Sequence, residues 1–268
     1  MSTVGVIAGK GKLPVLWTRR AAEKGHRVFV FALAEEPTEE LFPGAEDVFS
    51  VNINQFGELL TRLEKTNVKD VVMMGKVEKK RLFTGEQPDA CLQEILAGLE
   101  ELSDENILLG LAHRLEKSGF TVLEQTTYLE DLLPEPGVLT SVLPEEKLMA
   151  DMEFGFEMAR EIGRLDIGQT VVVKDRVVLA VEAIEGTDLA IARGGNLGEG
   201  GITVAKVSRP GQDFRFDVPA VGPDTLSVLK KYGANGLVLE AGKTFILEKE
   251  RFISAAAEAG IAVVALEG

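Results

Sequence analysis

Cysteine and histidine are almost absent from this chain of 268 residues, which has one cysteine, Cys91, and two histidines, His26 and His113. A single cysteine excludes an internal disulfide framework and a thiolate metal cluster, and it is typical of a protein in a reducing compartment. Two histidines are too few for a His-rich zinc site within one chain. Neither histidine accompanies a nucleophile motif such as G-x-S-x-G, so a Ser-His-Asp triad is poorly supported.

Excess positive charge and long apolar runs are also lacking. The chain has 29 Lys and Arg against 43 Asp and Glu, a formal charge of −14 and a pI of about 4.8. This balance argues against nucleic acid or an anionic membrane surface as the main electrostatic partner. No run of about 18 apolar residues occurs, and the first residues, MSTVGVIAGKGKLP, lack the charged and apolar regions of a secretory signal. We therefore expect a soluble, cytoplasmic protein.

The first half of the chain alternates short apolar runs with amphipathic segments. This alternation is typical of βαβ units and predicts a doubly wound, Rossmann-like α/β domain with a largely parallel sheet. Strands are predicted over residues 3–9, 26–34, 47–52, 69–75 and 119–125, and helices over 13–25, 55–67, 89–99 and 104–117.

A break rich in proline, YLEDLLPEPGVLTSVLPEEK, separates the two halves. Because a chain of this length exceeds the usual domain of about 100–150 residues, we expect two domains, 1–134 and 135–268, with the active site between them. The second half is predicted to be a distinct α/β or α+β domain. It begins with a helix over 148–163 whose stripe of Met152, Phe156, Ala159 and Ile162 is expected in the core.

Further elements of the second domain follow from similar patterns. A hairpin is predicted about residues 174–176, strands over 202–210, 236–248 and 261–268, and helices over 223–232 and 250–259. The run GGNLGEGG, residues 194–201, is rich enough in glycine that we expect an irregular loop there.

A glycine turn directly follows the first predicted strand. In VIAGKGKLP, Gly9 and Gly11 precede a helix start, where backbone N–H groups can receive a phosphate or a sugar, although a purely structural turn is an equal alternative. Pro14 stands where the dinucleotide fingerprint G-x-G-x-x-G needs its third glycine. An NAD-dependent oxidoreductase would also need a ribose-binding acid after the second strand, and Glu35 and Glu36 are only loosely placed for that role.

Gly75 and Lys76 follow another predicted strand of the same domain. Parallel sheets place ligands beyond the carboxyl ends of their strands, so these residues are expected on the same rim as the glycine turn. The lysine is a candidate for phosphate binding, and a solvated loop lysine is the alternative.

Acidic residues at predicted strand ends and loop entries dominate the second half. They are Asp166 in RLDIGQ, Glu182, Glu185 and Asp188 in EAIEGTD, and Asp217 in DFRFDVPAVG. With so little histidine and cysteine, a metal held here would be a hard cation bound through oxygen, with Mg²⁺ the natural choice and Mn²⁺ the alternative. Mg²⁺ usually takes one or two carboxylates and completes its shell with water and phosphate oxygens, which fits a diphosphate substrate and phosphoryl transfer to water.

A structural alternative exists for the EAIEGTD trio. Glu182 would then pair with a cation across the sheet, Glu185 would be solvated, and Asp188 would cap the following helix.

Several long, ordered motifs resemble one known family. The runs AREIGRLDIGQTVVV, LAVEAIEGTD and KVSRPGQDFRFDVPAVGPDT, with VIAGKGKLP and LSDENILLGLAHRLEKSGF, are similar to those of the UDP-2,3-diacylglucosamine pyrophosphatases of the LpxI type. The resemblance extends from Thr3 to about Leu266. It implies a Mg²⁺-dependent hydrolase of lipid A biosynthesis that forms UMP and 2,3-diacylglucosamine 1-phosphate, with attack expected on the phosphorus nearer the sugar.

The resemblance implies a role for Asp217, and the strand ends and loop entries described above supply the other candidates. Asp217 lies in the motif that carries the family's essential aspartate, so it is the first catalytic candidate and Asp188 the second. The metal ligands expected are Asp217, Asp188, Glu182 and Asp166, and the substrate-binding candidates are Gly9, Lys10, Gly11, Gly75, Lys76, Asp104, Gln169 and Thr187. This chain has Lys10 where the family often has Gly or Asn, and it retains Asp104 while the next acid is Glu105.

The partner implied is a small glycolipid nucleotide. Acyl chains need a long apolar crevice, because each buried methylene group contributes about 0.8 kcal/mol. We expect no nucleic acid partner and at most peripheral contact with the inner face of the membrane, and a homo-oligomer is compatible with the sequence. The alternative function is a non-catalytic lipid or nucleotide sensor with the same fold.

Overall fold

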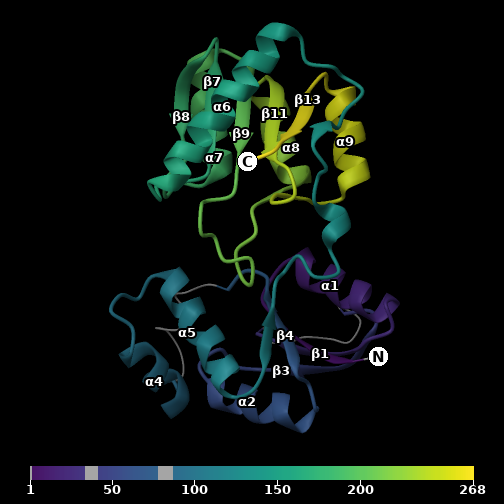
Figure 1. The fold of residues 1–268 in the computed structure, drawn as a ribbon, viewed down its shortest axis with the longest axis vertical. Coiled ribbons are helices and arrows are strands. Elements are labelled where there is room, and N and C mark those ends of the chain that lie inside the picture. The colour runs from purple at the N-terminus through teal and green to yellow at the C-terminus, as the bar shows by residue number, and fades with distance from the viewer. Residues whose placement is uncertain (1, 34–41, 78–86) are drawn as a thin grey trace. The chain divides into compact units, whose positions relative to one another are not determined.

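The computed structural model describes residues 2–33, 42–77 and 87–268, which form two compact units (Figure 1). The first comprises Met1–Leu129 together with Phe214–Phe216, and the second comprises Glu130–Asp213 and Asp217–Gly268. The chain therefore enters the second unit once, returns to the first for three residues, and then completes the second.

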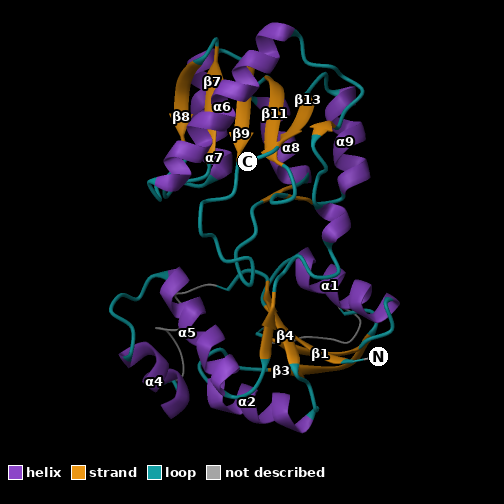
Figure 2. Ribbon diagram, in the orientation of Figure 1, coloured by secondary structure: helices purple, strands orange, loops and turns teal. Residues whose placement is uncertain are grey.

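The first unit is a parallel α/β domain (Figure 2). Its elements are β1 (Thr3–Ala8), α1 (Lys12–Glu23), β2 (Arg27–Ala32), β3 (Ala45–Ser50), α2 (Phe56–Lys65), β4 (Asp70–Met74), α4 (Ala90–Ala97), α5 (Asp104–Lys117) and β5 (Thr121–Leu123). The strand order is β3-β2-β1-β4-β5 and every neighbouring pair is parallel. The predicted Rossmann-like domain is confirmed.

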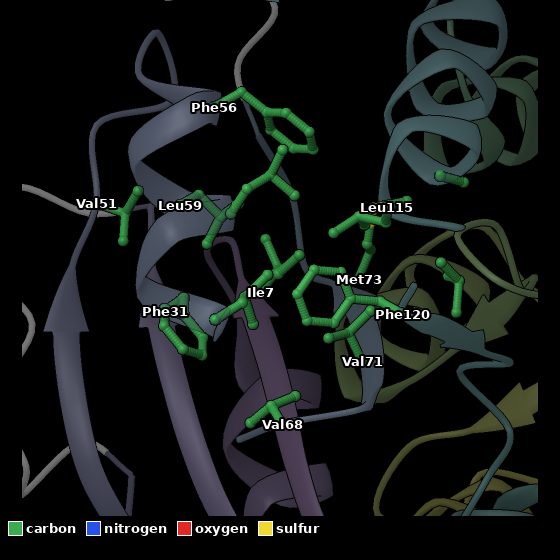
Figure 3. Close-up of a cluster of buried hydrophobic side chains, with 14 of the residues drawn as sticks. Ile7, Phe31, Val51, Phe56, Leu59, Val68, Val71, Met73, Leu115 and Phe120 are labelled. Carbon is green, nitrogen blue, oxygen red and sulfur yellow. The ribbon is translucent and has the colours of Figure 1, made fainter. Parts of the chain in front are cut away.

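Apolar residues from three helices pack on the sheet of this unit. Figure 3 shows Leu59 of α2 and Leu115 of α5 beside Ile7 and Met73 of the central strands, all of them buried. The helix α4 starts where Asp89 caps it by accepting a hydrogen bond from Leu92 N (2.8 Å). The same carboxylate accepts a hydrogen bond from the Gly57 backbone (2.6 Å) and so ties α4 to α2.

The second unit contains a mixed sheet of six strands. Its elements are a short 3-10 turn (Glu130–Leu132), β6 (Gly137–Val138), α6 (Glu146–Arg164), β7 (Thr170–Lys174), β8 (Val177–Val181), α7 (Thr187–Gly198), β9 (Ile202–Lys206), β10 (Ala220–Val221), α8 (Pro223–Lys231), β11 (Ala234–Glu240), β12 (Phe245–Ile246), α9 (Lys249–Glu258) and β13 (Ala262–Leu266). The order is β6-β13-β11-β9-β7-β8, with β9, β11 and β13 parallel and β7 antiparallel to both its neighbours. A separate parallel pair joins β10 and β12.

Helices cover both faces of this sheet. The predicted stripe of Met152, Phe156 and Ala159 on α6 is buried against one face, with Ile162 packed at its margin. Residues of α7, α8 and α9 form a second core with the alternate side chains of the same strands. The predicted hairpin is confirmed at the turn of Asp175 and Arg176, both of which have positive φ (52° and 56°).

The glycine-rich run after Ile191 is largely helical, so the expected loop over 194–201 is wrong for its first five residues. Helix α7 continues to Gly198 because its glycines allow very close packing. A Cβ at Gly194 would lie 2.5 Å from Val172 Cγ1, and one at Gly195 would lie 2.5 Å from Tyr232 Cβ. The helix ends at Glu199, which adopts the left-handed conformation (φ 53°).

Candidate active site

One edge of the second sheet carries the predicted site residues of the second half of the chain. The carboxyl ends of β8, β9, β11 and β13 meet there, because Lys206 is in register with Leu239, Glu240 with Leu266, and the start of β7 at Thr170 with Lys206. The segments that follow these ends, or precede β7, contain residues 166–169, 182–188 and 207–217. Ligands of α/β sheets bind at such edges, so this edge is the first candidate for a site.

Arg209 joins two of the predicted acidic residues at this edge. Its Nη1 donates to Asp166 Oδ1 (2.5 Å) and its Nη2 donates to Asp217 Oδ2 (3.2 Å). Gln212 Nε2 donates to the same oxygen of Asp217 (2.6 Å). The Asp217 side chain is 46% exposed and that of Asp166 is 73% exposed, so both carboxylates are accessible to a ligand.

Charge balance around Arg209 favours its ionised form. Burial alone would lower the pKa of Arg209, but the hydrogen bond and ion pair with Asp166 and the ion pair with Asp217 outweigh burial and raise the pKa above its ordinary value. The guanidinium therefore stays positively charged beside Asp217.

A second, buried polar cluster forms where α7 begins. Thr187 Oγ1 donates to Glu182 Oε1 (2.9 Å) and accepts from Lys206 Nζ (2.8 Å). Glu182 and Lys206 are only 7% and 6% exposed. Among the described residues, Glu182 Oε2 is buried without a hydrogen-bond partner. Gly186, with φ 85°, turns the chain so that Thr187 starts the helix beside Glu182.

Asp188 and Glu185, near the same turn, do not have the roles that the structural alternative gave them, which were to cap the helix and to be solvated. Asp188 lies exposed in the first turn of α7 and does not cap it, because the capping position is Gly186 and makes no side-chain cap bond. Glu185 is paired rather than solvated: it accepts from Arg193 Nη2 (2.5 Å), and this hydrogen bond lowers the pKa of Glu185. Gln169 precedes β7, and its Oε1 is buried with no partner in the described part of the chain.

Three of the four predicted metal ligands lie near one of two cations. Asp217 and Asp166 flank Arg209, and Glu182 is joined through Thr187 to Lys206. Within residues 2–33, 42–77 and 87–268, no group of three or more His, Cys, Asp and Glu side chains is arranged to hold a metal. The accessible Asp166 and Asp217 pair nevertheless fits the donor set of Mg²⁺, which commonly takes one or two carboxylates and completes its shell with water and phosphate.

The glycine turns of the first domain pack against each other. Gly9 N donates to Met74 O (2.7 Å), and a Cβ at Gly9 would lie 2.7 Å from Lys76 O. A Cβ at Gly75 would lie 2.8 Å from Gly9 C. These contacts give Gly9 and Gly75 a packing reason, and their role in substrate binding stays a prediction.

The loops after β1 and β4 are also joined by a backbone bridge. Lys10 N donates to Lys76 O and Lys76 N donates to Lys10 O, both at 2.8 Å. Gly11, with φ 117°, is the N-cap of α1, and a Cβ placed on it would meet no atom within 4 Å. The exposed rim of Lys10, Gly11 and Lys76 is therefore the part of the predicted phosphate site that remains open to a ligand.

For three other residues named in the sequence analysis, the structure does not describe the side chain. Asp104 is the first residue of α5, and its side chain lies outside what the structure describes. Glu35 and Glu36, on which the NAD alternative depends, also lie outside the described residues.

An apolar cavity of about 180 Å³ lies at the carboxyl ends of the first sheet. It is lined by residues that follow each of the five strands: Gly9, Leu33, Ile53, Gly75 and Gln125. The remaining wall is mostly apolar and includes Ile7, Phe56, Leu59 and Met73, which Figure 3 shows together. One lining residue, Phe216, comes from the segment 214–216 that returns from the second half of the sequence.

Comparisons with known proteins match nearly the whole length of the chain. A model of the LpxI N-terminal domain matches residues 3–132, and a model of the LpxI C-terminal domain matches residues 135–264. The protein named UDP-2,3-diacylglucosamine pyrophosphatase LpxI of Caulobacter vibrioides is 32% identical over 281 aligned positions, which cover 100% of this chain and 98% of that protein. The chain belongs to the LpxI family. The family resemblance of its motifs is thereby confirmed.

Sequence reasoning missed four residues of this LpxI-family chain. Lys206, Arg209 and Gln212 stand around the predicted acids, and Phe216 lines the cavity. All four lie in the run KVSRPGQDFRFD, residues 206–217, which ends at Asp217. The rule that ligands gather beyond the carboxyl ends of strands, applied to the strand that ends at Lys206, would have indicated the first three.

No helix of the LpxI-family chain, in the part that the structure describes, has both the length and the apolar character needed to cross a membrane.

Proposed function

We propose that this chain hydrolyses the diphosphate of UDP-2,3-diacylglucosamine to UMP and 2,3-diacylglucosamine 1-phosphate, a step of lipid A biosynthesis. The family membership along the whole chain supports this reaction, as does the name of the relative from Caulobacter vibrioides. The structural observation that carries the proposal is an accessible carboxylate, Asp217, held by Arg209 and Gln212 at a strand-end edge.

Asp217 is proposed to take the proton of the attacking water. Both of its hydrogen bonds within the described residues go to Oδ2, which leaves Oδ1 to accept from water. The water oxygen forms a bond to the phosphorus nearer the sugar, its proton passes to Oδ1, and the bond from that phosphorus to the bridging oxygen breaks to release UMP. General-base catalysis of this kind typically contributes about 10²–10⁴-fold.

Arg209 is proposed to stabilise negative charge on the phosphate oxygens. It is ionised and lies 3.2 Å from Asp217, so its charge is present where the reacting group must sit. Its contact with Asp166 orients the guanidinium, because Nη1 and Nη2 donate hydrogen bonds to two different carboxylates, those of Asp166 and Asp217.

A hard cation is part of the proposal. Asp217 and Asp166 are the residues proposed to hold Mg²⁺ or Mn²⁺, and Asp188 and Glu182 are further candidates. When bound, such an ion supplies positive charge to the phosphate oxygens and increases the acidity of water. Asp217 then serves as a ligand or as the base, and the experiment below tests separately whether the metal and the carboxylate are required.

The apolar cavity is proposed to take an acyl chain of the substrate. Its wall is formed by aliphatic and aromatic side chains, and burial of each methylene group contributes about 0.8 kcal/mol to binding. The open rim of Lys10, Gly11 and Lys76 is proposed to bind the phosphate or sugar of the same substrate.

The test is UMP release from UDP-2,3-diacylglucosamine with Mg²⁺ or with EDTA. Asp217→Asn is expected to lower kcat by about 10²-fold or more, because the amide cannot accept the proton. The matched control is Asp224→Asn, an exposed aspartate in the first turn of α8, which is expected to keep wild-type kcat.

Three outcomes would contradict parts of this scheme. Activity that survives EDTA would show that no metal is required. An active Asp217→Asn variant would show that Asp217 is not the general base. A wild-type protein that binds the lipid product tightly without turnover would favour the sensor.

A further inference from the structure

The segment from Asp213 to Asp217 connects the two units through a very short excursion. Asp213 and Asp217 belong to the second unit, whereas Phe214–Phe216 belong to the first. The base of the excursion is closed by a hydrogen bond from Asp217 N to Asp213 O (3.0 Å). Phe214, Arg215 and Phe216 therefore form a tip that belongs to the first unit, whereas Asp213 and Asp217, which flank the tip, belong to the second.

Each residue of this tip has its own anchor in the first unit. Phe214 O accepts from the Gln125 backbone N–H (2.8 Å). Arg215 Nη1 donates to Glu116 Oε1 of α5 (2.6 Å). Phe216 packs against the core of the first unit and lines its apolar cavity.

The anchor of Phe214 is itself part of the cavity wall. Gln125 is 6% exposed, and its Nε2 donates to Met73 O (2.7 Å). Gln125 and Met73 both line the cavity. A molecule that fills the cavity thus contacts Phe216 directly and also contacts the residue that holds the backbone of the tip.

Phe216 and Asp217 are consecutive in the chain. Their Cα atoms are therefore about 3.8 Å apart across a trans peptide, so a displacement of Phe216 acts directly on the backbone of Asp217. The carboxylate of Asp217 is meanwhile held by Gln212 and Arg209 of the second unit. The residue that follows Phe216 in the chain is thus the one whose carboxylate the polar cluster holds.

We infer that Phe216 is a positioning residue that makes the reaction depend on an aliphatic chain in the cavity. A chain that packs on the ring holds the tip, and through it holds Asp217 in the place that the reaction requires. Binding energy from a part of the substrate that does not react is then used at the reacting centre, which raises kcat rather than only lowering KM. The inference rests on the proposed function, and it assigns the chain a role beyond affinity.

The experiment measures kcat and KM separately with UDP-2,3-diacylglucosamine for Phe216→Ala, Phe216→Leu and Arg215→Met. A misplacement of about 1 Å can cost about 10²-fold in rate, so Phe216→Ala is expected to lower kcat by about 10–100-fold with KM changed less than about threefold. Phe216→Leu, which still fills space in the cavity, is expected to recover most of kcat. Arg215→Met releases the tip without changing the cavity wall, and it is expected to lower kcat as well.

The matched control is Phe120→Leu. Phe120 is 6% exposed in the same core and is not among the residues that line the cavity. This variant is expected to lower the melting temperature while leaving kcat and KM close to wild type. UDP-N-acetylglucosamine, which lacks the two acyl chains, serves as a second substrate, and the slow turnover expected for wild type is expected to be the same in Phe216→Ala.

Each contrary result has a distinct meaning. Wild-type protein that releases no UMP from either substrate refutes the proposed function itself. If wild type is active, an increase in KM alone for Phe216→Ala shows that the ring is only part of the cavity wall and overturns the inference. An equal loss of kcat in Phe120→Leu, or a wild-type kcat in Arg215→Met, overturns it too.

Discussion

Arg209 is expected to matter far more for the reaction than for the stability of the fold. Arg209→Met removes the positive charge beside Asp217, one of the two donors to Asp217 Oδ2, and the bond to Asp166. The Asp166 side chain is 73% exposed and that of Asp217 is 46% exposed, so solvent already screens both pairs. Such pairs contribute about 0–1 kcal/mol each to stability.

The catalytic loss is expected to be larger. A hydrogen bond to a charged group contributes about 1.5–3 kcal/mol where it is made. If this contribution is realised in the transition state, kcat falls by about 10–150-fold, because each 1.36 kcal/mol corresponds to a factor of ten. Arg209→Lys keeps the charge but offers a single nitrogen to two carboxylates, so it is expected to recover only part of the loss.

The assay combines UMP release with thermal and urea unfolding of the same preparations. Arg251→Met is the matched control, because Arg251 forms a comparable exposed ion pair with Glu248 (2.9 Å). We expect the control to keep wild-type kcat and both variants to unfold within about 1–2 kcal/mol of wild type. A kcat of Arg209→Met within twofold of wild type would refute the proposed role of the guanidinium.

Three further predictions concern the elements that support the site. Gly194→Ala is expected to destabilise the protein by about 1–3 kcal/mol in urea unfolding, because its Cβ would overlap the sheet beneath α7; an unchanged midpoint would contradict the packing reason. Asp151→Ala removes the acceptor of two backbone N–H groups at the turn between β7 and β8 (2.9 and 2.7 Å), with an expected loss of about 1–3 kcal/mol and faster hydrogen exchange at that turn. For Glu185, the hydrogen bond from Arg193 lowers the pKa, so its contribution to stability is present above pH about 4.3 and lost as the pH falls further. Melting temperatures of Glu185→Gln should therefore lie below wild type at pH 7, and the difference should shrink as the pH falls below about 4.3.

Local patterns predicted most of the elements. Alternating apolar runs and amphipathic segments found the strands and helices of the first domain, since a parallel α/β domain buries its strands on both faces and its helices on one. The same reasoning found the hairpin of β7 and β8 and the buried stripe of Met152 and Phe156 on α6. The family motif indicated Asp217 as the first residue of the site, and the boundary after residue 134 stays a prediction.

The sequence does not show which neighbours in space a glycine packs against. Gly194 reads as a helix breaker in isolation, yet α7 needs it because no Cβ fits against Val172. Gly9 reads as part of a phosphate loop, and the structure adds a packing reason, because a Cβ there would lie 2.7 Å from Lys76 O; its role in substrate binding stays a prediction. Glycine is used where the backbone needs a positive φ and where another part of the chain packs too closely for a Cβ. Only the residues that surround the glycine in the fold show which of the two reasons applies.

The sequence by itself determined the fold class, the acidic residues at strand ends of the second half and the family, because each depends on residues close together along the chain. Only the tertiary structure showed that Arg209 joins Asp166 to Asp217, and that Phe216 lines an apolar cavity of the other unit. Contacts between residues 43 positions apart, such as Asp166 and Arg209, are made by strand register and leave no periodic signal. The residues that were predictable carry local patterns, and the environment that would make Asp217 reactive is built from distant segments.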